Sequence, residues 1–477
     1  MAPLYSVAEI GDIERHAAAA LAPGALMQLA GQAAAAAALE MAGGQSILVL
    51  AGPGNNGGDA LEAAARLTDA GMAVHIVRLA SDGTTAPEAA QVLQQHWDLI
   101  IDGLFGIGLA RPLDGAARAL ALAVNALRCP VLALDVPSGL DADTGAIIGP
   151  DGVAIQADRT ITFIGDKPGL HTLEGRDCAG EVQVAALGID AAGMPPATAH
   201  LNSCALFAAQ LAPRRHNSHK GSFGDVVIVG GAAGMAGAPV LAARAALFMG
   251  AGRVFVAALA PAAAFDSVHP EIMFRDAADV SGDDGTLVIG PGMGDSAAAI
   301  RVLGCALDSA AALVVDADAL NLVADSPDLQ SRLAARKGPS LMTPHPLEAA
   351  RLLGVTTTVV QSDRLSAARE IAARFRAVVV LKGSGSVIAD PGGAVVVNTS
   401  GNAGLATAGS GDVLAGMAGS LLAQGWPLWE AALGTVWMHG AAAERLVEDG
   451  AGPIGMTAGE LPGAARLVRN ALSRKAP

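Results

Sequence analysis

Short apolar runs alternate with stretches of helical spacing along most of the chain. Residues 47–51 (ILVLA) form one apolar run, residues 61–71 (LEAAARLTDAG) carry apolar positions at helical spacing, and residues 73–79 (AVHIVRL) are apolar again. This order is typical of a βαβ unit, in which a helix connects two parallel strands. The pattern continues through residues 98–106 (DLIIDGLFG) and 131–139 (VLALDVPSG), with the helical stretch GAARALALAVNAL between them. It predicts a parallel sheet whose strands are buried on both faces.

The alternation is interrupted once and then resumes. Residues 190–200 (DAAGMPPATAH) contain a glycine, two adjacent prolines and no periodicity, which indicates a domain boundary between about 190 and 214. A second α/β series follows and begins with DVVIVGG. We therefore predict an α/β protein with two domains, residues 1–205 and 206–477. Their glycine-rich loops differ in spacing, so we expect two unrelated folds rather than a duplication.

Composition narrows the classes of function. A chain of 477 residues that is 52% hydrophobic is long enough for two α/β cores. Its 30 basic and 45 acidic residues give a net charge of −15, which disfavours general affinity for nucleic acid or anionic lipid. No run of about 20 apolar residues predicts a membrane span. The four cysteines form no CxxC pair, so we expect neither a zinc site nor disulfides, and a cytoplasmic protein.

Polar side chains follow the predicted strands of the first domain. Because ligands of open parallel sheets bind at the carboxyl ends of the strands, these side chains should converge on one crevice. Asp135 ends a strand there and could act as an acid or base, although it could also be a structural turn acid. The residues expected in this crevice are Asn55, Asn56, Asp59, Asp102, Asp135 and Ser138.

The second domain contains a candidate phosphate site, AGSGDVLAG, at residues 408–416. Glycines let successive N–H groups point at one spot, and the helix that follows adds positive potential at its N-terminus. Asp412 could accept the proton of a hydroxyl group that attacks phosphorus. The alternative is that Asp412 only complements the helix dipole.

Two further motifs support this site. KGSGS, residues 382–386, adds a glycine turn and a lysine suited to phosphate, although it could be a simple hairpin between two strands. TPHPLE, residues 343–348, sets Glu348 in the first turn of a helix, where it could bind Mg²⁺ through water or merely complement the dipole. His345 alone is more often structural than catalytic.

The motifs of both halves occur together in one known family. The second half, over residues 214–470, resembles the ADP- or ATP-dependent NAD(P)H-hydrate dehydratases of ribokinase-like fold. The first half, over residues 5–190, resembles the NAD(P)H-hydrate epimerases, which implies a Rossmann-like three-layer α/β/α domain. Together the halves resemble the bifunctional NAD(P)H-hydrate repair enzymes. The motifs of the second half are PGMG, TPHPLE, KGSGS, GNAGLATAGSGDVLAG, HNSHKGSFGDV and GMAGAPVLAARAALFMGAG, and those of the first half are GPGNNGGDA, DGLFGIGLARPLDG, LDVPSGLDADTG and TFIGDKPGL.

The resemblance implies a function in metabolite repair. The substrates would be NADHX and NADPHX, whose nicotinamide ring has added water across the C5–C6 bond. The first domain would interconvert the R and S hydrates. The second would use ADP or ATP to phosphorylate the C6 hydroxyl of the S hydrate, and phosphate would then leave, pushed by the ring nitrogen. The expected partners are these small molecules, with no nucleic acid and no membrane, and a homo-oligomer is expected.

In the first domain the resemblance implies a hydrate site and a K⁺ site. The K⁺ ligands would be Asn56, Asp102 and Ser138, and oxygen ligands suit a hard cation. Ala60 and Ile107 depart from the family pattern, which more often has glycine and threonine at these positions. The implied hydrate contacts are Asn55, Asn56, Gly57, Gly58, Asp59, Gly106, Ile107, Gly108, Leu109, Ala110, Arg111, Pro112 and Asp135.

In the second domain the resemblance implies two sets of contacts. Asp412 would be the catalytic base and would touch the hydrate together with Ala238, Gly294 and His345. Ser386 stands where the family more often has threonine and keeps the hydroxyl. The implied nucleotide contacts are Lys382, Gly383, Ser384, Gly385, Ser386 and Gly411.

Two other functions fit the same motifs. A kinase acting on a vitamin-precursor alcohol shares the fold and the GSGD loop, and a nucleotide-sensing module could bind without turnover. The upstream domain argues against the kinase, and the retained acids Asp412, Glu348 and Asp135 argue against the sensor. The sequence leaves open the choice between ADP and ATP and between NADHX and NADPHX.

Overall fold

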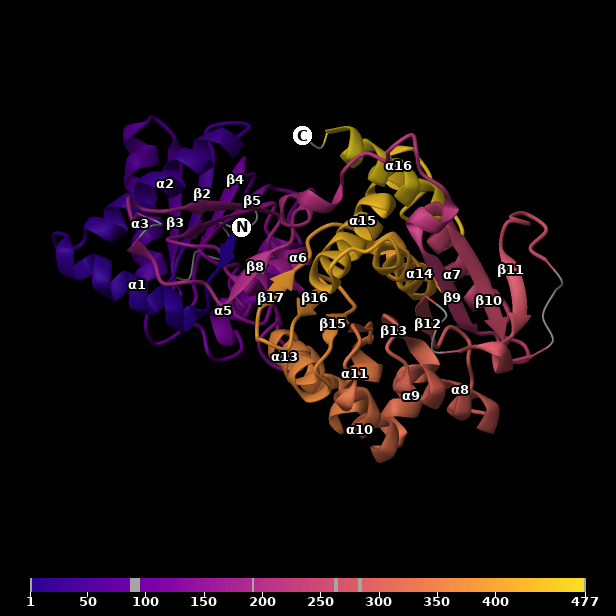
Figure 1. The fold of residues 1–477 in the computed structure, drawn as a ribbon. Helices are drawn as coiled ribbons and strands as arrows, with labels where there is room; N and C mark the ends of the chain where they lie inside the picture. Colours follow the sequence, from indigo (N-terminus) through magenta and orange to yellow (C-terminus); the bar gives the residue numbers. More distant parts are fainter. Residues whose placement is uncertain (1, 86–94, 191–192, 261–264, 282–284, 476–477) are drawn as a thin grey trace. The chain divides into compact units, whose positions relative to one another are not determined.

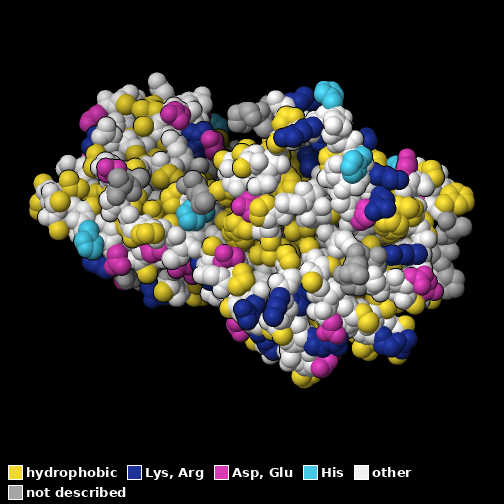
Figure 2. Space-filling view, in the orientation of Figure 1, with side chains coloured by type: hydrophobic (Ala, Val, Ile, Leu, Met, Phe, Trp, Pro, Cys, Tyr) yellow, Lys and Arg dark blue, Asp and Glu magenta, His cyan; other side chains and the backbone are white. Residues whose placement is uncertain are grey.

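The computed structural model describes residues 2–85, 95–190, 193–260, 265–281 and 285–475. The chain divides into two compact units, Ala2–His200 and Leu201–Pro477, which we call the first and second units (Figure 1). Within the described residues, no helix is both long enough and apolar enough to span a membrane. On the face drawn in Figure 2, acidic and basic side chains are interspersed.

The first unit is built on a parallel sheet with the strand order β3-β2-β4-β5-β6-β7. Two short strands lie outside this sheet: β1 near the start of the unit pairs antiparallel with β8 near its end, with Leu4 opposite Ala199. The strands are β1 Pro3–Leu4, β2 Ser46–Ala51, β3 Ala73–Arg78, β4 Leu99–Gly103, β5 Val131–Leu134, β6 Arg159–Phe163, β7 Glu181–Ala185 and β8 Ala199–Leu201. The helices are α1 Val7–Ala20, α2 Ala25–Met41, α3 Asn55–Asp69, α5 Gly115–Asn125 and α6 Gly175–Cys178.

Helices cover both faces of this sheet. Along β2, Ile47 packs in a core with α1, α2 and α3, whereas its neighbour Leu48 packs in a second core with α5. Successive side chains of a strand point to opposite faces, so a strand buried on both sides is apolar throughout. The three-layer α/β/α architecture predicted for this half is confirmed.

The prediction that helical structure follows the GPGNNGGDA motif from residue 61 was wrong. Helix α3 begins at Asn55, so Asn55–Asp59 of that motif lie in its first turns rather than in a loop. The early start depends on Gly57, because a Cβ atom there would lie 1.8 Å from the carbonyl oxygen of Gly52. The preceding strand therefore passes almost directly into the helix.

The second unit is built on a larger, mixed sheet. From β11 through β10, β9, β12, β13 and β14 to β15 all pairs are parallel, and β16 and β17 extend the sheet antiparallel. The strands are β9 Asp225–Gly230, β10 Arg253–Ala258, β11 Met273–Asp276, β12 Thr286–Ile289, β13 Leu313–Val315, β14 Ser340–Met342, β15 Val378–Leu381, β16 Val387–Ala389 and β17 Val395–Val397. The helices are α7 Gly237–Phe248, α8 Ala297–Asp308, α9 Ala317–Asp325, α10 Pro327–Ala335, α11 Pro346–Leu353, α12 Thr357–Ser362, α13 Arg364–Phe375, α14 Ser410–Ala423, α15 Leu428–Glu448 and α16 Leu461–Lys475.

Helices α7, α14, α15 and α16 pack on one face of this sheet around alternate strand residues such as Val226, Val254 and Val288. The intervening residues, such as Val227 and Leu287, are also fully buried. The strand predicted at DVVIVGG is β9, and the helix starts predicted at TPHPLE and near Asp412 are confirmed.

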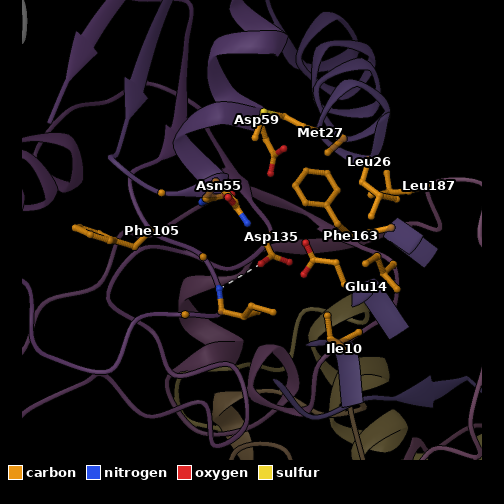
Figure 3. A pocket seen from close by; sticks show the side chains of 18 of the residues that line it. Ile10, Glu14, Leu26, Met27, Asn55, Asp59, Phe105, Asp135, Phe163 and Leu187 are labelled. Carbon is orange, nitrogen blue, oxygen red and sulfur yellow. Dashed lines mark hydrogen bonds between the residues drawn. The ribbon is translucent and has the colours of Figure 1, made fainter. Parts of the chain in front are cut away.

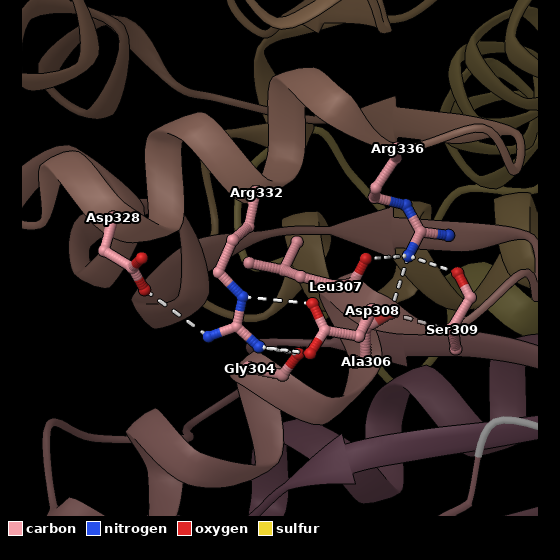
Figure 4. A network of polar contacts seen from close by, with 8 residues as sticks. All are labelled: Gly304, Ala306, Leu307, Asp308, Ser309, Asp328, Arg332 and Arg336. Carbon is pink, nitrogen blue, oxygen red and sulfur yellow. Dashed lines mark hydrogen bonds and ion pairs between the residues drawn. The ribbon is translucent and has the colours of Figure 1, made fainter.

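Two arginines close the end of α8 (Figure 4). Arg336 donates to the carbonyl oxygens of Ala306, Leu307 and Ser309, and Arg332 binds the Asp308 carboxylate at 2.7 Å. The last carbonyls of a helix lack partners within the helix, so these guanidinium groups supply the missing donors. This cluster is structural.

Candidate active sites

The first site is a cavity of about 890 Å³ at the carboxyl ends of the first unit's strands (Figure 3). The structure brings most of the predicted hydrate contacts to its wall. Gly57, Gly58 and Pro112 are not among the lining residues, and neither are Asp102 and Ser138. The predicted residues that do line it are Asn55, Asn56, Asp59, Gly106, Ile107, Gly108, Leu109, Ala110, Arg111 and Asp135.

Helices α1 and α2 supply a wall that the sequence did not predict. Glu14 of α1 and Met27 of α2 line the cavity, and Phe163 closes it from the end of β6. In Figure 3 the carboxyl groups of Glu14, Asp59 and Asp135 all face this space. No motif marks Glu14, because an acid on a surface helix gives no signal of what the helix covers.

Asp135 is fixed at the end of β5 by two contacts. Its backbone lies in the left-handed region, with φ 65°, which L-residues rarely adopt outside functional sites. One carboxylate oxygen accepts from Lys167 Nζ at 2.6 Å, and the other accepts from the backbone N–H of Ile107 at 3.2 Å. Lys167 is fully buried and also donates to Thr162 and Phe163. The sequence showed Lys167 in TFIGDKPGL but gave no sign of this pairing.

Asp59 lies in the same cavity in a different environment. Burial, followed by repulsion from Asp135 and Glu14, raises the pKa of Asp59 to about 7. Among the described residues, no group donates a hydrogen bond to its carboxyl and no cation pairs with it. The site therefore holds one carboxylate paired with a lysine and one that takes up a proton near neutral pH.

Of the three predicted K⁺ ligands, Asp102 and Ser138 contact each other, and Asn56 lines the cavity. Ser138 donates its backbone N–H and its hydroxyl to Asp102 at 2.8 and 2.7 Å. Asp102 is fully buried, and burial raises its pKa to about 6 against the lowering effect of these bonds. Asn56 donates to the carbonyl oxygen of Leu134, which leaves its own buried Oδ1 without a partner among the described residues.

The second site lies where three neighbouring parallel strands of the second unit, β13, β14 and β15, end. Asp316 follows β13, Thr343 and His345 follow β14, and Lys382 follows β15. Lys382 Nζ lies 2.7 Å from the carboxylate of Asp316 and 3.9 Å from that of Glu348. Burial lowers the pKa of Lys382, but the attraction of Asp316, Glu348 and Asp412 outweighs this, and the pKa is raised.

Asp412 lies in the first turn of α14, as predicted, and lacks a hydrogen-bond donor among the described residues. Burial, followed by repulsion from Asp316, raises its pKa to about 6, and Lys382 only partly offsets this. A Cβ atom at Gly411 would lie 3.2 Å from Lys382 Nζ, so the GSGD turn and the lysine are adjacent. Behind this turn, burial lowers the pKa of His439 to about 4, which keeps its imidazole neutral.

His345 and Glu348 cap α11 together. His345 Nδ1 accepts from the N–H groups of Leu347 and Glu348, and Glu348 accepts from the N–H of His345 at 2.8 Å. Glu348 is buried, whereas His345 is partly exposed. The structural alternative for this motif is therefore present, and a role of Glu348 toward Mg²⁺ stays a prediction.

The predicted nucleotide loop 382–386 joins β15 to β16, so the hairpin described as its alternative also exists. Beneath it lies a fully buried arginine, Arg364, which donates to the carbonyl oxygens of Leu381, Lys382 and Gly385. A Cβ atom at Gly383, where φ is 143°, would lie 2.3 Å from this guanidinium. Arg364 was missed because its sequence context is an ordinary helix start.

The predicted hydrate contacts Ala238 and Gly294 lie on neighbouring segments. Gly294 donates its N–H to Asp318 at 2.8 Å, and its φ of 66° suits glycine. A Cβ atom at Gly292 would lie 3.3 Å from that of Ala238, at the start of α7. Asp316 and Asp318 were read only as part of an apolar strand end and were not predicted as site residues.

Family models match both units. The model described as NAD(P)H-hydrate dehydratase matches residues 226–464, and the model described as YjeF-related protein N-terminus matches residues 23–96 and 80–169.

Individual relatives extend over the whole chain. A "Bifunctional NAD(P)H-hydrate repair enzyme Nnr" of Coxiella burnetii is 36% identical over 97% of this chain and 98% of its own. An "ADP-dependent (S)-NAD(P)H-hydrate dehydratase" of Neisseria meningitidis is 46% identical over 55% of this chain and 90% of its own. A crystal structure of the ADP/ATP-dependent NAD(P)H-hydrate dehydratase of Bacillus subtilis, co-crystallised with ATP/Mg²⁺, is 30% identical with a TM-score of 0.51. It covers 57% of this chain and 98% of its own.

Proposed function

The chain belongs to the family of bifunctional NAD(P)H-hydrate repair enzymes, and from this premise we propose how its two units divide the work. The first unit epimerises the R and S hydrates of NADH and NADPH. The second unit dehydrates the S hydrate to NAD(P)H at the expense of ADP, or ATP. The observation that carries this division is that each unit has its own aspartate beside a lysine at the carboxyl edge of a parallel sheet, Asp135 with Lys167 and Asp412 near Lys382.

In the first unit, Asp135 is the proton-transfer group of the epimerase. The Lys167 ammonium holds the Asp135 carboxylate at 2.6 Å in the wall of the cavity, where a carboxylate can accept a proton from the ligand. The cavity volume of about 890 Å³ suits a dinucleotide-sized ligand. The N-terminus of α3, at Asn55, supplies N–H groups for the pyrophosphate of the hydrate.

The residues of the proposed K⁺ site fit that ion. The donors at Asn56, Asp102 and Ser138 are oxygens, and the buried Asn56 Oδ1 has no protein partner among the described residues. One carboxylate among neutral oxygens favours a monovalent cation over a divalent one. When bound, the ion would supply positive charge that offsets the buried Asp102 carboxylate.

In the second unit, Asp412 is the base that accepts the proton of the C6 hydroxyl as oxygen bonds to phosphorus. Lys382 and the N–H groups of the GSGD turn hold the nucleotide phosphates, and Ala238, Gly294 and His345 contact the hydrate. Transfer of the terminal phosphoryl group releases the shortened nucleotide and converts a poor leaving group into a good one. The ring nitrogen lone pair then expels phosphate to give an N1=C6 iminium, and loss of the C5 proton to water restores the C5–C6 double bond. The nucleotide contacts include Gly383, Ser384, Gly385, Ser386 and Gly411.

The proposal includes Mg²⁺ with the nucleotide. Glu348 is a buried carboxylate beside Lys382, and oxygen donors suit this ion. When bound, Mg²⁺ would supply charge that offsets the phosphate oxygens. It further includes a cytoplasmic homo-oligomer, which rests on composition and on the family resemblance.

Product analysis tests the proposal. Purified protein is mixed with the separated hydrates and with ADP or ATP, absorbance at 340 nm is followed, and the hydrates are resolved by chiral chromatography. Recovery of NADH with equilibration of R and S is expected. A stable phosphorylated product would identify a kinase instead, and absence of turnover would identify a binding module.

A further inference from the structure

Two aspartates lie just after the end of β13, and their carboxylates contact different parts of the second unit. Asp316 follows the strand directly, and Asp318 lies in the first turn of α9. Between them, Ala317 has φ 47°, a left-handed conformation that residues with a Cβ atom rarely adopt. Because of this bend, the two aspartates contact different residues although they are only two positions apart in the sequence.

Asp316 holds the lysine of the nucleotide loop. Its side chain is 1% exposed, and its Oδ1 accepts from Lys382 Nζ at 2.7 Å and from Thr343 Oγ1 at 2.8 Å. The loop after β15 is thereby attached to the end of β13. A lysine side chain has several rotatable bonds, so this contact decides where its ammonium lies.

Asp318 binds the PGMG turn, residues 291–294, which follows β12. Its Oδ2 accepts from the N–H of Gly294 at 2.8 Å, at the end of the PGMG turn that follows β12. Gly290, at the start of that turn, lies so close that a Cβ atom there would be 1.7 Å from the Asp316 carbonyl oxygen. The PGMG turn is therefore packed against the same bend that carries both acids.

We propose that Asp316 and Asp318 are a pair of positioning residues that align the two substrates of phosphoryl transfer separately. Asp316 acts through Lys382 on the nucleotide, and Asp318 acts through Gly294 on the hydrate. The inference rests on the proposed dehydratase function and adds two residues to it. Phosphoryl transfer depends mainly on alignment, and a displacement of about 1 Å can lower its rate by about 10²-fold.

The two substitutions should change different kinetic constants. Asp316→Asn removes the charge that orients Lys382, so kcat for NADH recovery should fall at least about 10-fold while KM for the hydrate stays within about three-fold. Asp318→Asn weakens the hold on Gly294, so KM for the hydrate should rise about 10-fold while kcat stays within about three-fold. A purely structural role would reduce the amount of folded protein without separating the two constants.

A double-substitution cycle tests the path through the lysine. Once Lys382→Met has removed the ammonium, adding Asp316→Asn should change kcat by less than about two-fold. Asp316→Asn alone leaves the Lys382 ammonium buried without its carboxylate, whereas the double variant has no such ammonium. If Asp316→Asn alone does not fold, the double variant therefore decides the question. A further loss of 10-fold or more in the Lys382→Met background would overturn the role of Asp316.

Asp308→Asn is the matched control, because Asp308 pairs with Arg332 in the cluster that closes α8 (Figure 4). It should leave both constants within about two-fold of wild type. The proposal is wrong if Asp316→Asn and Asp318→Asn shift the same constant, or if both behave like Asp308→Asn. Wild-type protein that recovers no NADH with either nucleotide contradicts the proposed function itself, which is a separate result.

Discussion

Each of the two sites contains a lysine and a proposed catalytic aspartate, but the lysine binds that aspartate in only one of them. In the first unit the lysine, Lys167, bonds directly to the proposed catalytic aspartate, Asp135, at 2.6 Å. In the second unit the lysine, Lys382, bonds to Asp316 at 2.7 Å, and the proposed catalytic Asp412 has no donor of its own among the described residues.

The difference shows that a carboxylate's role follows from its partner more than from its motif. Asp135 accepts a hydrogen bond from a directly bound ammonium, whereas burial and repulsion from Asp316 raise the pKa of Asp412 to about 6. A pKa near the working pH is the condition under which a general base accepts a proton in the transition state and releases it afterwards. The first site therefore holds its proposed catalytic aspartate in a direct ion pair, whereas the proposed catalytic aspartate of the second site has a pKa raised toward neutral pH.

Exchanging the two proposed catalytic acids for amides should have the largest effects. Asp412→Asn should lower nucleotide-dependent dehydration by about 10² to 10⁴-fold, because an amide cannot accept the hydroxyl proton. Its nucleotide affinity should stay near wild type, since backbone N–H groups and Lys382 remain. Asp135→Asn should lower epimerisation by a similar factor and leave dehydration of the S hydrate intact.

Single-turnover NADH recovery, nucleotide calorimetry and chiral chromatography separate these effects. Each variant is the control for the other unit. Recovery by Asp412→Asn within a few-fold of wild type would mean that Asp412 only complements the helix dipole.

Removing the buried lysine of the first site should be strongly destabilising. Lys167→Met leaves a buried carboxylate without its cation, which costs about 3 to 5 kcal/mol of unfolding free energy. Arg66→Met is the matched control, because Arg66 pairs with Glu62 on the surface and such pairs contribute about 0 to 1 kcal/mol. Urea unfolding measures both. Equal losses in the two variants would show that the buried Lys167 pair contributes no more to stability than a surface pair.

The raised pKa values predict how stability depends on pH. The pKa of Asp59 is about 7 in the folded protein and near 4 in the unfolded chain. The contribution of this group to the free energy of unfolding is therefore fully present below pH 4 and is lost as the pH rises through 7. Asp59→Asn should therefore be more stable than wild type at pH 8 by up to about 4 kcal/mol, and the gain should vanish near pH 4. Asp412→Asn should show a smaller gain, because its pKa is raised only to about 6. Melting temperatures at pH 4 and pH 8 measure the gain in stability of each variant. A larger gain for Asp412→Asn than for Asp59→Asn would contradict the prediction.

The smallest expected effects come from substituting one glycine in each unit, Gly57 and Gly411, by alanine. A Cβ atom at Gly57 meets the backbone oxygen of Gly52 at 1.8 Å, whereas at Gly411 it meets only the end of Lys382 at 3.2 Å. Gly411→Ala should change stability by no more than about 1 kcal/mol, because better helix propensity offsets the contact. It should still slow dehydration by displacing Lys382. Thermal unfolding of both variants should show the larger loss for Gly57→Ala, and equal losses would contradict this reading.

The strands and the loops that follow them could be predicted because buried parallel strands leave continuous apolar runs. Asp135 and Asp412 were found this way, since each follows or begins a regular element in a glycine-containing turn. Lys167 could not be assigned, because a lysine in sequence gives no sign that it is fully buried against a carboxylate 32 positions away. Glu14 was missed because the path of α1 over the cavity depends on long-range packing.

The same limit applies to the second unit. The roles of Asp316 and Asp318 depend on the left-handed turn at Ala317, and alanine does not signal such a turn in sequence. The position of α3 likewise depends on a close approach at Gly57, which spacing alone does not show.

The pairing of β1 with β8 has a consequence for how the first unit can be cut from its chain. Because Leu4 lies opposite Ala199, the two ends of this unit are neighbours, and a short linker could join them in a circularly permuted protein. New termini could then be opened at a surface loop away from the cavity. A fragment that stops at residue 190 would lack the partner strand of β1, and α1, which carries Glu14, would lose the anchor of its leading end. The excised epimerase therefore needs residues 2–201 rather than the shorter stretch that its motifs span.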